Sequence, residues 1–87
     1  MNITTAKTSD IPALCELLTV LFSQEAEFMP DREAQRRGLD RIVRDPEIGH
    51  ILVARDDGEK ILAMVNLLYT VSTALGARVA LLEDMIV

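Results

Sequence analysis

The hydrophobic pattern of this chain changes its period once, near His50, and this change constrains the fold more than any other feature. Before it, apolar residues recur every three or four positions, which is the spacing of amphipathic helices. After it, apolar residues form short runs separated by turn sequences, which is the pattern of β-strands. We therefore expect an α+β domain whose helices come from the first half and whose sheet comes largely from the second.

The first half predicts one short strand and two helices. Residues 3–7 alternate weakly and contain threonines, as a short strand does. Residues 8–10, Thr-Ser-Asp, offer an N-cap for a helix that ends near Phe22. A second helix is expected to start at Asp31 as its N-cap and to stop at Asp45-Pro46. The first helix has an apolar stripe (Ile11, Leu14, Leu17, Leu18, Leu21) and the second a thinner one (Ala34, Leu39, Ile42, Val43).

The second half predicts three strands, at residues 51–55, 60–72 and 78–87. Asp56-Asp57-Gly58 is a strong hairpin signal between the first two, and residues 73–76 make a second turn. The predicted order is thus β-α-α-β-β-β, with an antiparallel meander at the end. The last strand is apolar enough to be a central strand, which needs a hydrogen-bonding partner on each side.

Composition excludes several classes of function. A net charge of −5 argues against a nucleic-acid partner, which a basic patch normally recognises. No apolar run approaches the roughly 20 residues of a membrane helix, and the N-terminus lacks the features of a signal peptide. One cysteine and one histidine exclude a disulfide framework and a zinc site within a single chain. We expect a soluble cytoplasmic domain with no metal, no nucleic acid and no membrane contact.

Three segments carry a resemblance to a known family. Residues 3–12 resemble its opening strand and helix start. Residues 52–65 resemble the hairpin of its second and third strands, with Ala63 among the residues that replace the usual glycines. Residues 81–87, Leu-Leu-Glu-Asp-Met-Ile-Val, resemble its fourth strand, where an acidic pair followed by a hydrophobic triplet is common. In this order the segments resemble the N-terminal half of a GCN5-related N-acetyltransferase (GNAT).

The resemblance covers residues 1–87 and implies one partial GNAT domain, without the C-terminal half that carries the pyrophosphate loop for CoA. It implies acetyl transfer from acetyl-CoA to a primary amine of a small molecule or a protein. We expect the chain to be inactive alone, with the C-terminal half as the partner that covers its last strand and completes the acetyl-CoA site. The alternative is a non-catalytic half-domain that self-associates as a homodimer through that strand.

The resemblance places catalytic residues on the last strand. Glu83 is the first candidate for the general base, with Asp84 as the second. Strand alternation predicts that these two acids point to opposite faces of the sheet. The alternative is that they pair with a cation such as Arg78 or face solvent. The resemblance also implies that the backbone of three residues binds acetyl-CoA and polarises its thioester: Met85, Ile86 and Val87.

The resemblance places the acceptor site between the two helices, around Glu25, Glu27 and Phe28. Acids there would suit a cationic amine. The alternative for these three residues is a solvated loop with one buried phenylalanine. Cys15 lies within the apolar stripe of the first helix, so we expect a buried, unreactive thiol rather than a nucleophile.

Overall fold

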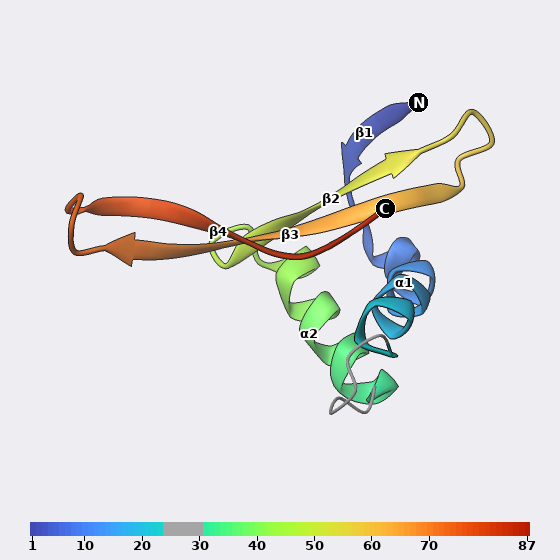
Figure 1. Cartoon of the computed structure of the whole chain (residues 1–87), viewed down its shortest axis with the longest axis horizontal. Helices are drawn as coiled ribbons and strands as arrows, with labels where there is room; N and C mark the ends of the chain where they lie inside the picture. Colours follow the sequence, from blue (N-terminus) through green and yellow to red (C-terminus); the bar gives the residue numbers. More distant parts are fainter. Residues whose placement is uncertain (24–30) are drawn as a thin grey trace.

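Both α-helices of the computed structural model lie on one face of a four-stranded antiparallel sheet (Figure 1). The structure describes residues 1–23 and 31–87. The strand order is β1-β2-β3-β4, so each strand pairs with its neighbour in sequence. The elements are β1 (Asn2–Thr5), the 3-10 turn η1 (Thr8–Asp10), α1 (Ile11–Ser23), α2 (Arg32–Arg44), β2 (Gly49–Arg55), β3 (Ile61–Ser72) and β4 (Ala77–Ile86). The predicted α+β class and the order β-α-α-β-β-β are confirmed.

The sheet extends the predicted meander by one strand, because β1 pairs antiparallel with β2. β2 also begins earlier than predicted, at Gly49, which pairs with Leu68 of β3. A Cβ atom built on Gly49 would lie 2.2 Å from the backbone oxygen of Leu67. This position therefore admits only glycine without a backbone shift, and the close approach lets β2 pair with β3 from the first residue of β2.

The start of α1 differs from the prediction. Residues 8–10 were expected to supply an N-cap, but they form η1, which runs directly into α1. The carboxylate of Asp10 accepts a hydrogen bond from the backbone N–H of Lys7 at 2.8 Å, so it caps the turn from within. The stripe on α1 is confirmed by its buried residues, Ile11, Leu14, Cys15 and Leu18. Burial raises the pKa of the Cys15 thiol, as expected for an unreactive cysteine.

The start and end of α2 follow the prediction. The side chain of Asp31 accepts a hydrogen bond from the backbone N–H of Ala34 at 3.1 Å, and the helix ends at Arg44. Ala34 itself is exposed, and Gln35 is buried in its place beside Leu39. The Gln35 side chain accepts a hydrogen bond from the Thr19 hydroxyl at 3.3 Å, so a polar contact joins α2 to α1.

Both predicted turns are present. In the first, the Asp56 carboxylate accepts hydrogen bonds from the backbone N–H groups of Gly58 and Lys60, each at 2.9 Å. Glu59 rather than Gly58 takes the left-handed conformation there, with φ at 68°. In the second turn Gly76 has φ at 63°, and its N–H donates to the Ser72 carbonyl. Glycine favours that conformation because it has no Cβ.

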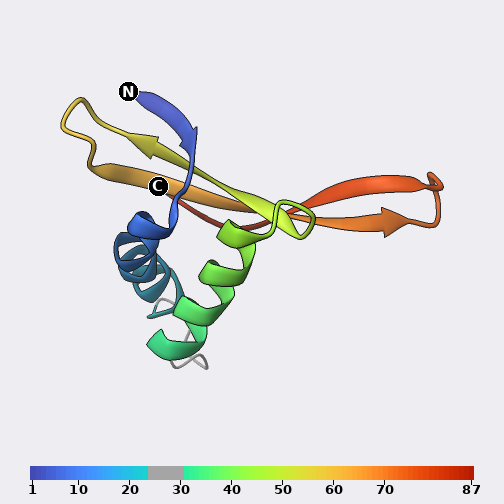
Figure 2. The same ribbon diagram turned by 180° about the vertical axis from the view of Figure 1, so that it is seen from behind.

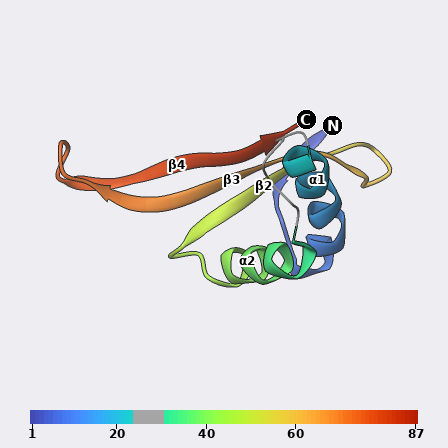
Figure 3. The same ribbon diagram turned by 60° about the horizontal axis from the view of Figure 1, so that its bottom comes forward.

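The core lies between the helices and the face of the sheet that they cover. Its largest fully buried side chains are Leu14, Leu39, Ile51 and Val53. Described residues leave the opposite face of the sheet open, and the turn end of the β3–β4 hairpin projects beyond the helices (Figures 2 and 3). None of the helices in the described part of the chain is long and apolar enough to cross a membrane.

Candidate functional site

A β-bulge interrupts β4 within the segment that the sequence singles out. Ile86 pairs with Met64 and Glu83 pairs with Asn66, so two residues of β4, Asp84 and Met85, lie opposite one residue of β3. Asp84 takes the left-handed conformation, with φ at 52°. Bulges of this kind redirect side chains and occur often beside active sites.

The bulge brings Glu83 and Asp84 to the same neighbour. Glu83 is the register partner of Asn66, and the Asp84 carboxylate accepts a hydrogen bond from the Asn66 side-chain amide at 2.9 Å. The regular alternation that predicted opposite faces for the two acids therefore does not hold across the bulge. The physical reason is the extra residue, which shifts the register by one position and breaks the period of two.

The two acids differ in their surroundings. Asp84 is half-buried and held by Asn66. Glu83 is exposed, and within the described part of the chain no hydrogen bond or ion pair engages its carboxylate. β4 lies at the edge of the sheet, so its outer backbone groups have no strand partner among the described residues. β4 was expected to be a central strand with a partner on each side. Among the described residues it has a partner, β3, on one side only.

Arg78, named above as a possible cation for these acids, is engaged elsewhere. Its guanidinium lies 4.2 Å from the centre of the Tyr69 ring and donates to the Glu47 carbonyl at 2.8 Å. It also forms an ion pair with the Glu47 carboxylate at 3.6 Å. The Tyr69 hydroxyl in turn is hydrogen-bonded to His50. Arg78 therefore belongs to a cluster near the start of β4, and Asp84 finds its partner in Asn66 instead.

The three residues implied to bind acetyl-CoA divide between the two faces of the sheet. Ile86 packs against the helix-covered core. Met85 and Val87 line a shallow apolar groove of about 210 Å³ on the open face. We call this the outer groove; its lining is Ile3, Leu52, Val53, Ala54, Ala63, Met64, Val65, Met85 and Val87. The three residues are thus consecutive in the chain, but their side chains lie in different surroundings.

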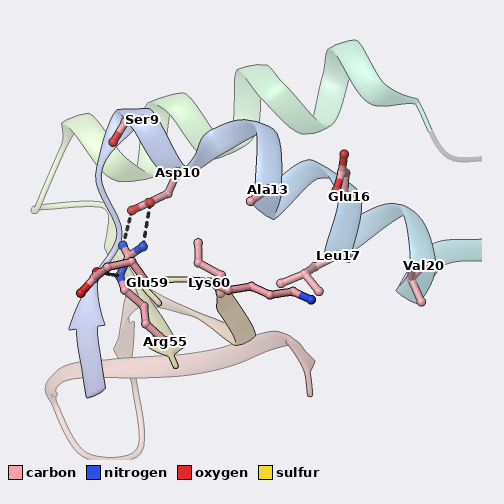
Figure 4. A pocket seen from close by; sticks show the side chains of 10 residues that line it. Ser9, Asp10, Ala13, Glu16, Leu17, Val20, Arg55, Glu59 and Lys60 are labelled. Atoms are coloured by element: carbon pink, nitrogen blue, oxygen red, sulfur yellow. Dashed lines mark hydrogen bonds and ion pairs between the residues drawn. The ribbon is translucent and has the colours of Figure 1, made fainter. Parts of the chain in front are cut away.

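A larger cavity, of about 450 Å³, lies between α1 and the β2–β3 turn (Figure 4). Its charged wall is the ion pair of Asp10 with Arg55, in which both side chains are 9% exposed. A hydrogen bond from Arg55 holds the pKa of Asp10 below its usual value. Lys60 and Glu59 also border the cavity. Opposite charges already pair within it, and Glu83 and Asp84 are not among its lining residues, so we assign it a structural role.

The proposed acceptor-site residues Glu25, Glu27 and Phe28 lie outside the described residues. Asn66, in contrast, is a site residue to which the sequence analysis assigned no role. Its signal in the sequence is that it is the one amide in the apolar run from Ile61 to Tyr69. A lone buried amide in a strand needs a polar partner, and such a partner cannot be located from local sequence.

Comparisons with solved structures support the family resemblance at the level of fold. A possible acetyltransferase from Clostridium difficile 630 superposes with a TM-score of 0.86 at 16% identity, over 99% of this chain and 56% of its own. A protein described as a probable acetyltransferase superposes with a TM-score of 0.80 at 25% identity, over 100% of this chain and 57% of its own. A predicted acetyltransferase from Clostridium acetobutylicum, solved with acetyl-CoA, superposes with a TM-score of 0.77 at 14% identity, over 98% of this chain and 58% of its own.

No protein-family model matches the sequence, and no curated protein matches it. The chain spans little more than half the length of the solved structures that it matches. Its β-α-α-β-β-β arrangement is that of the N-terminal portion of a GNAT acetyltransferase. The chain therefore has a partial GNAT fold, as the sequence resemblance implied.

Proposed function

We propose that this chain forms the N-terminal half of an N-acetyltransferase site, which transfers an acetyl group from acetyl-CoA to a primary amine. The observation that carries the proposal is the bulged edge strand β4, where the exposed Glu83 lies beside backbone groups without a strand partner among the described residues. An extended arm such as the pantetheine of acetyl-CoA can pair with a free strand edge as an added strand does. The matched fold of a structure solved with acetyl-CoA supports this assignment.

The proposed reaction needs a free amine and a polarised thioester. Glu83 accepts one proton from the substrate ammonium, which frees the nitrogen lone pair. The nitrogen attacks the thioester carbonyl carbon, the C–N bond forms and the C–S bond breaks. The nitrogen loses its second proton, the CoA thiolate takes up one proton, and the other proton passes to solvent. Backbone N–H groups in residues 85–87 are proposed to stabilise the oxyanion formed during attack.

The surroundings of the two acids favour Glu83 over Asp84 as the base. A general base must be free to reach the proton it removes. The Glu83 carboxylate is exposed and unengaged within the described residues, whereas Asp84 already accepts a hydrogen bond from Asn66. Asp84 remains the second candidate.

The acceptor is proposed to be a cationic amine. Glu25, Glu27 and Phe28 are proposed to contact it, since acidic side chains attract a positive charge. The 87-residue chain is proposed to be inactive alone, because it spans little more than half of the matched structures. The test therefore uses the protein as its source cell makes it.

The experiment measures release of the CoA thiol from acetyl-CoA with a panel of primary amines: a polyamine, an amino sugar, free lysine and a peptide with a free N-terminus. We expect amine-dependent release, and Glu83→Gln should lower kcat by about 100-fold. Glu16→Gln is the matched control, because Glu16 is an exposed acid on α1. Absence of amine-dependent release in the wild type would reject the proposed function. Wild-type kcat in Glu83→Gln would reject only the role of Glu83.

A second candidate function is self-association through β4. It is favoured by the apolar side chains that this edge strand exposes: Leu81 is 51% exposed, Leu82 60% and Met85 59%. Two copies pairing β4 against β4 would satisfy the free edge in a closed, two-fold dimer. Light scattering of the 87-residue chain should then give twice the monomer mass of 9.7 kDa. A well-behaved monomer would count against this candidate.

A further inference from the structure

We infer that Asn66 is a positioning residue of this site: its side chain locks the β4 bulge and so sets where Glu83 and the backbone at Met85 stand. This inference rests on the proposed function for its catalytic consequence, although the lock itself is a structural property. It assigns a role to a residue of β3 that neither belongs to the acidic pair nor lies on the edge strand.

The bulge needs an interaction to hold it. Asp84 has φ at 52°, a conformation that residues other than glycine rarely adopt, although aspartate tolerates it better than most. The extra residue also interrupts the ladder of hydrogen bonds between β3 and β4. A regular pairing of the same strands would avoid both penalties. The observed bulge therefore depends on a contact that the regular pairing would lose.

The hydrogen bond from Asn66 to Asp84 is that contact. Asn66 is 3% exposed, and its amide nitrogen lies 2.9 Å from the Asp84 carboxylate. An ionised carboxylate only accepts hydrogen bonds, so the amide must turn its NH₂ group toward it. The amide oxygen then faces away and has no partner among the described residues. An apolar residue would avoid this unsatisfied oxygen, so the contact with Asp84 accounts for an amide at this point.

The lock has a direct consequence for Glu83. In the observed register Glu83 lies opposite Asn66, on the face of Asn66 and Met64, while Ile86 lies opposite Met64. Removing the bulge would shift one part of β4 by one residue relative to β3. A shift by one residue turns each side chain of that part to the other face of the sheet. Either Glu83 or Ile86 would then lose its present face, and the backbone at Met85 would rejoin the ladder.

The test compares three proteins with the wild type. Asn66→Leu replaces the amide by an apolar side chain with the same branching and the same number of non-hydrogen atoms. The double variant Asn66→Asp with Asp84→Asn exchanges the two groups, so the same hydrogen bond can form with donor and acceptor reversed, and asparagine also tolerates the left-handed conformation. Gln35→Leu is the matched control, because Gln35 is the other buried amide with an unpartnered polar atom in the described residues, and it lies on α2.

The first readout is amide hydrogen exchange at residues 83–86, which does not depend on activity. We expect faster hydrogen exchange in Asn66→Leu, a near wild-type rate in the double variant, and no change in Gln35→Leu. Unchanged exchange in Asn66→Leu would overturn the lock. If Asn66→Leu does not fold, the double variant decides the outcome. A wild-type rate of hydrogen exchange supports the lock, and a faster rate overturns it.

The second readout is catalysis by the protein as its source cell makes it. We expect kcat to fall about tenfold or more in Asn66→Leu with a smaller change in KM for the amine, because the reacting groups are displaced rather than removed. The double variant changes Asp84, the second candidate for the base, so it is judged by hydrogen exchange and not by kcat. A folded Asn66→Leu with wild-type kcat contradicts the positioning role. A wild type without acetyl transfer rejects the proposed function instead, and the exchange data still decide the lock.

Discussion

Asp10 and Arg55 lie far apart in the sequence, and in the folded chain their side chains form a bidentate ion pair. Arg55 donates from Nη1 to Asp10 Oδ1 at 3.0 Å and from Nη2 to Oδ2 at 2.5 Å. Its Nε also donates to the Thr4 hydroxyl at 3.2 Å. The contact therefore ties the start of α1 to the end of β2 and to β1. Figure 4 shows the two side chains facing one another at the edge of the cavity.

Removing one partner of this pair should destabilise the protein strongly. Asp10→Ala leaves the Arg55 charge 9% exposed and without its carboxylate, which should lower the free energy of unfolding by about 3 kcal/mol. Urea unfolding measures the change. Asp57→Ala is the control, because Asp57 is fully exposed and lies 3.8 Å from the N-terminal amine. It should change stability by less than about 0.5 kcal/mol. A loss below about 1 kcal/mol in Asp10→Ala would contradict the prediction.

The same pair should contribute to acid sensitivity. The hydrogen bond from Arg55 lowers the pKa of Asp10 from its ordinary value of 3.8 in the unfolded chain. The stabilisation is thus fully present above that value and is lost as the pH falls through the lower folded-state pKa. Urea unfolding of wild type and Asp10→Asn should show a stability difference that is constant above about pH 5 and shrinks below about pH 4. A difference that grows on acidification would refute this assignment.

Two glycines should respond to alanine in opposite directions. At Gly49 the new Cβ would meet the backbone oxygen of Leu67 at 2.2 Å, so the strands must separate and stability should fall by about 3 kcal/mol or more. At Gly38, within α2, the new Cβ meets nothing within 4 Å. Alanine there should stabilise the helix by up to about 1 kcal/mol. Thermal unfolding of both variants measures the two changes in stability. Changes in the same direction would contradict the prediction.

The Cys15 thiol should be unreactive in the folded protein. It is 2% exposed, and burial raises its pKa, so little thiolate is available. A disulfide reagent that reports thiol release should modify it slowly under native conditions and rapidly in concentrated urea. Rapid modification of the native protein would show that α1 opens locally or that the thiol is accessible.

Most of the secondary structure could be predicted because local patterns determine it. The stripe on α1 requires only a spacing of three and four residues, and the cap at Asp31 requires only a side chain three residues before Ala34. Gly76 and the acidic turn at Asp56 are likewise signals within a few residues. The burial of Gln35 could not be predicted, because it depends on the packing of α1 beside α2, which the sequence of α2 alone does not reveal.

The candidate site was predictable as a segment but not as a geometry. The acidic pair and its apolar neighbours marked residues 81–87, and alternation then predicted opposite faces for Glu83 and Asp84. That prediction assumed a regular strand. The bulge depends on a hydrogen bond between residues of two different strands, Asn66 and Asp84, and no pattern within either strand contains it.

The sequence by itself thus determined the class of fold, the order of its elements and the segment that carries the acids, because periodicity, caps and turns act over a few residues. Only the tertiary structure decided the pairing of β1 with β2, the burial of Arg55 against Asp10 and the bulge beside Asn66. Each of these joins residues distant in sequence. Their energies depend on desolvation and on distances that exist only once the strands and helices have packed.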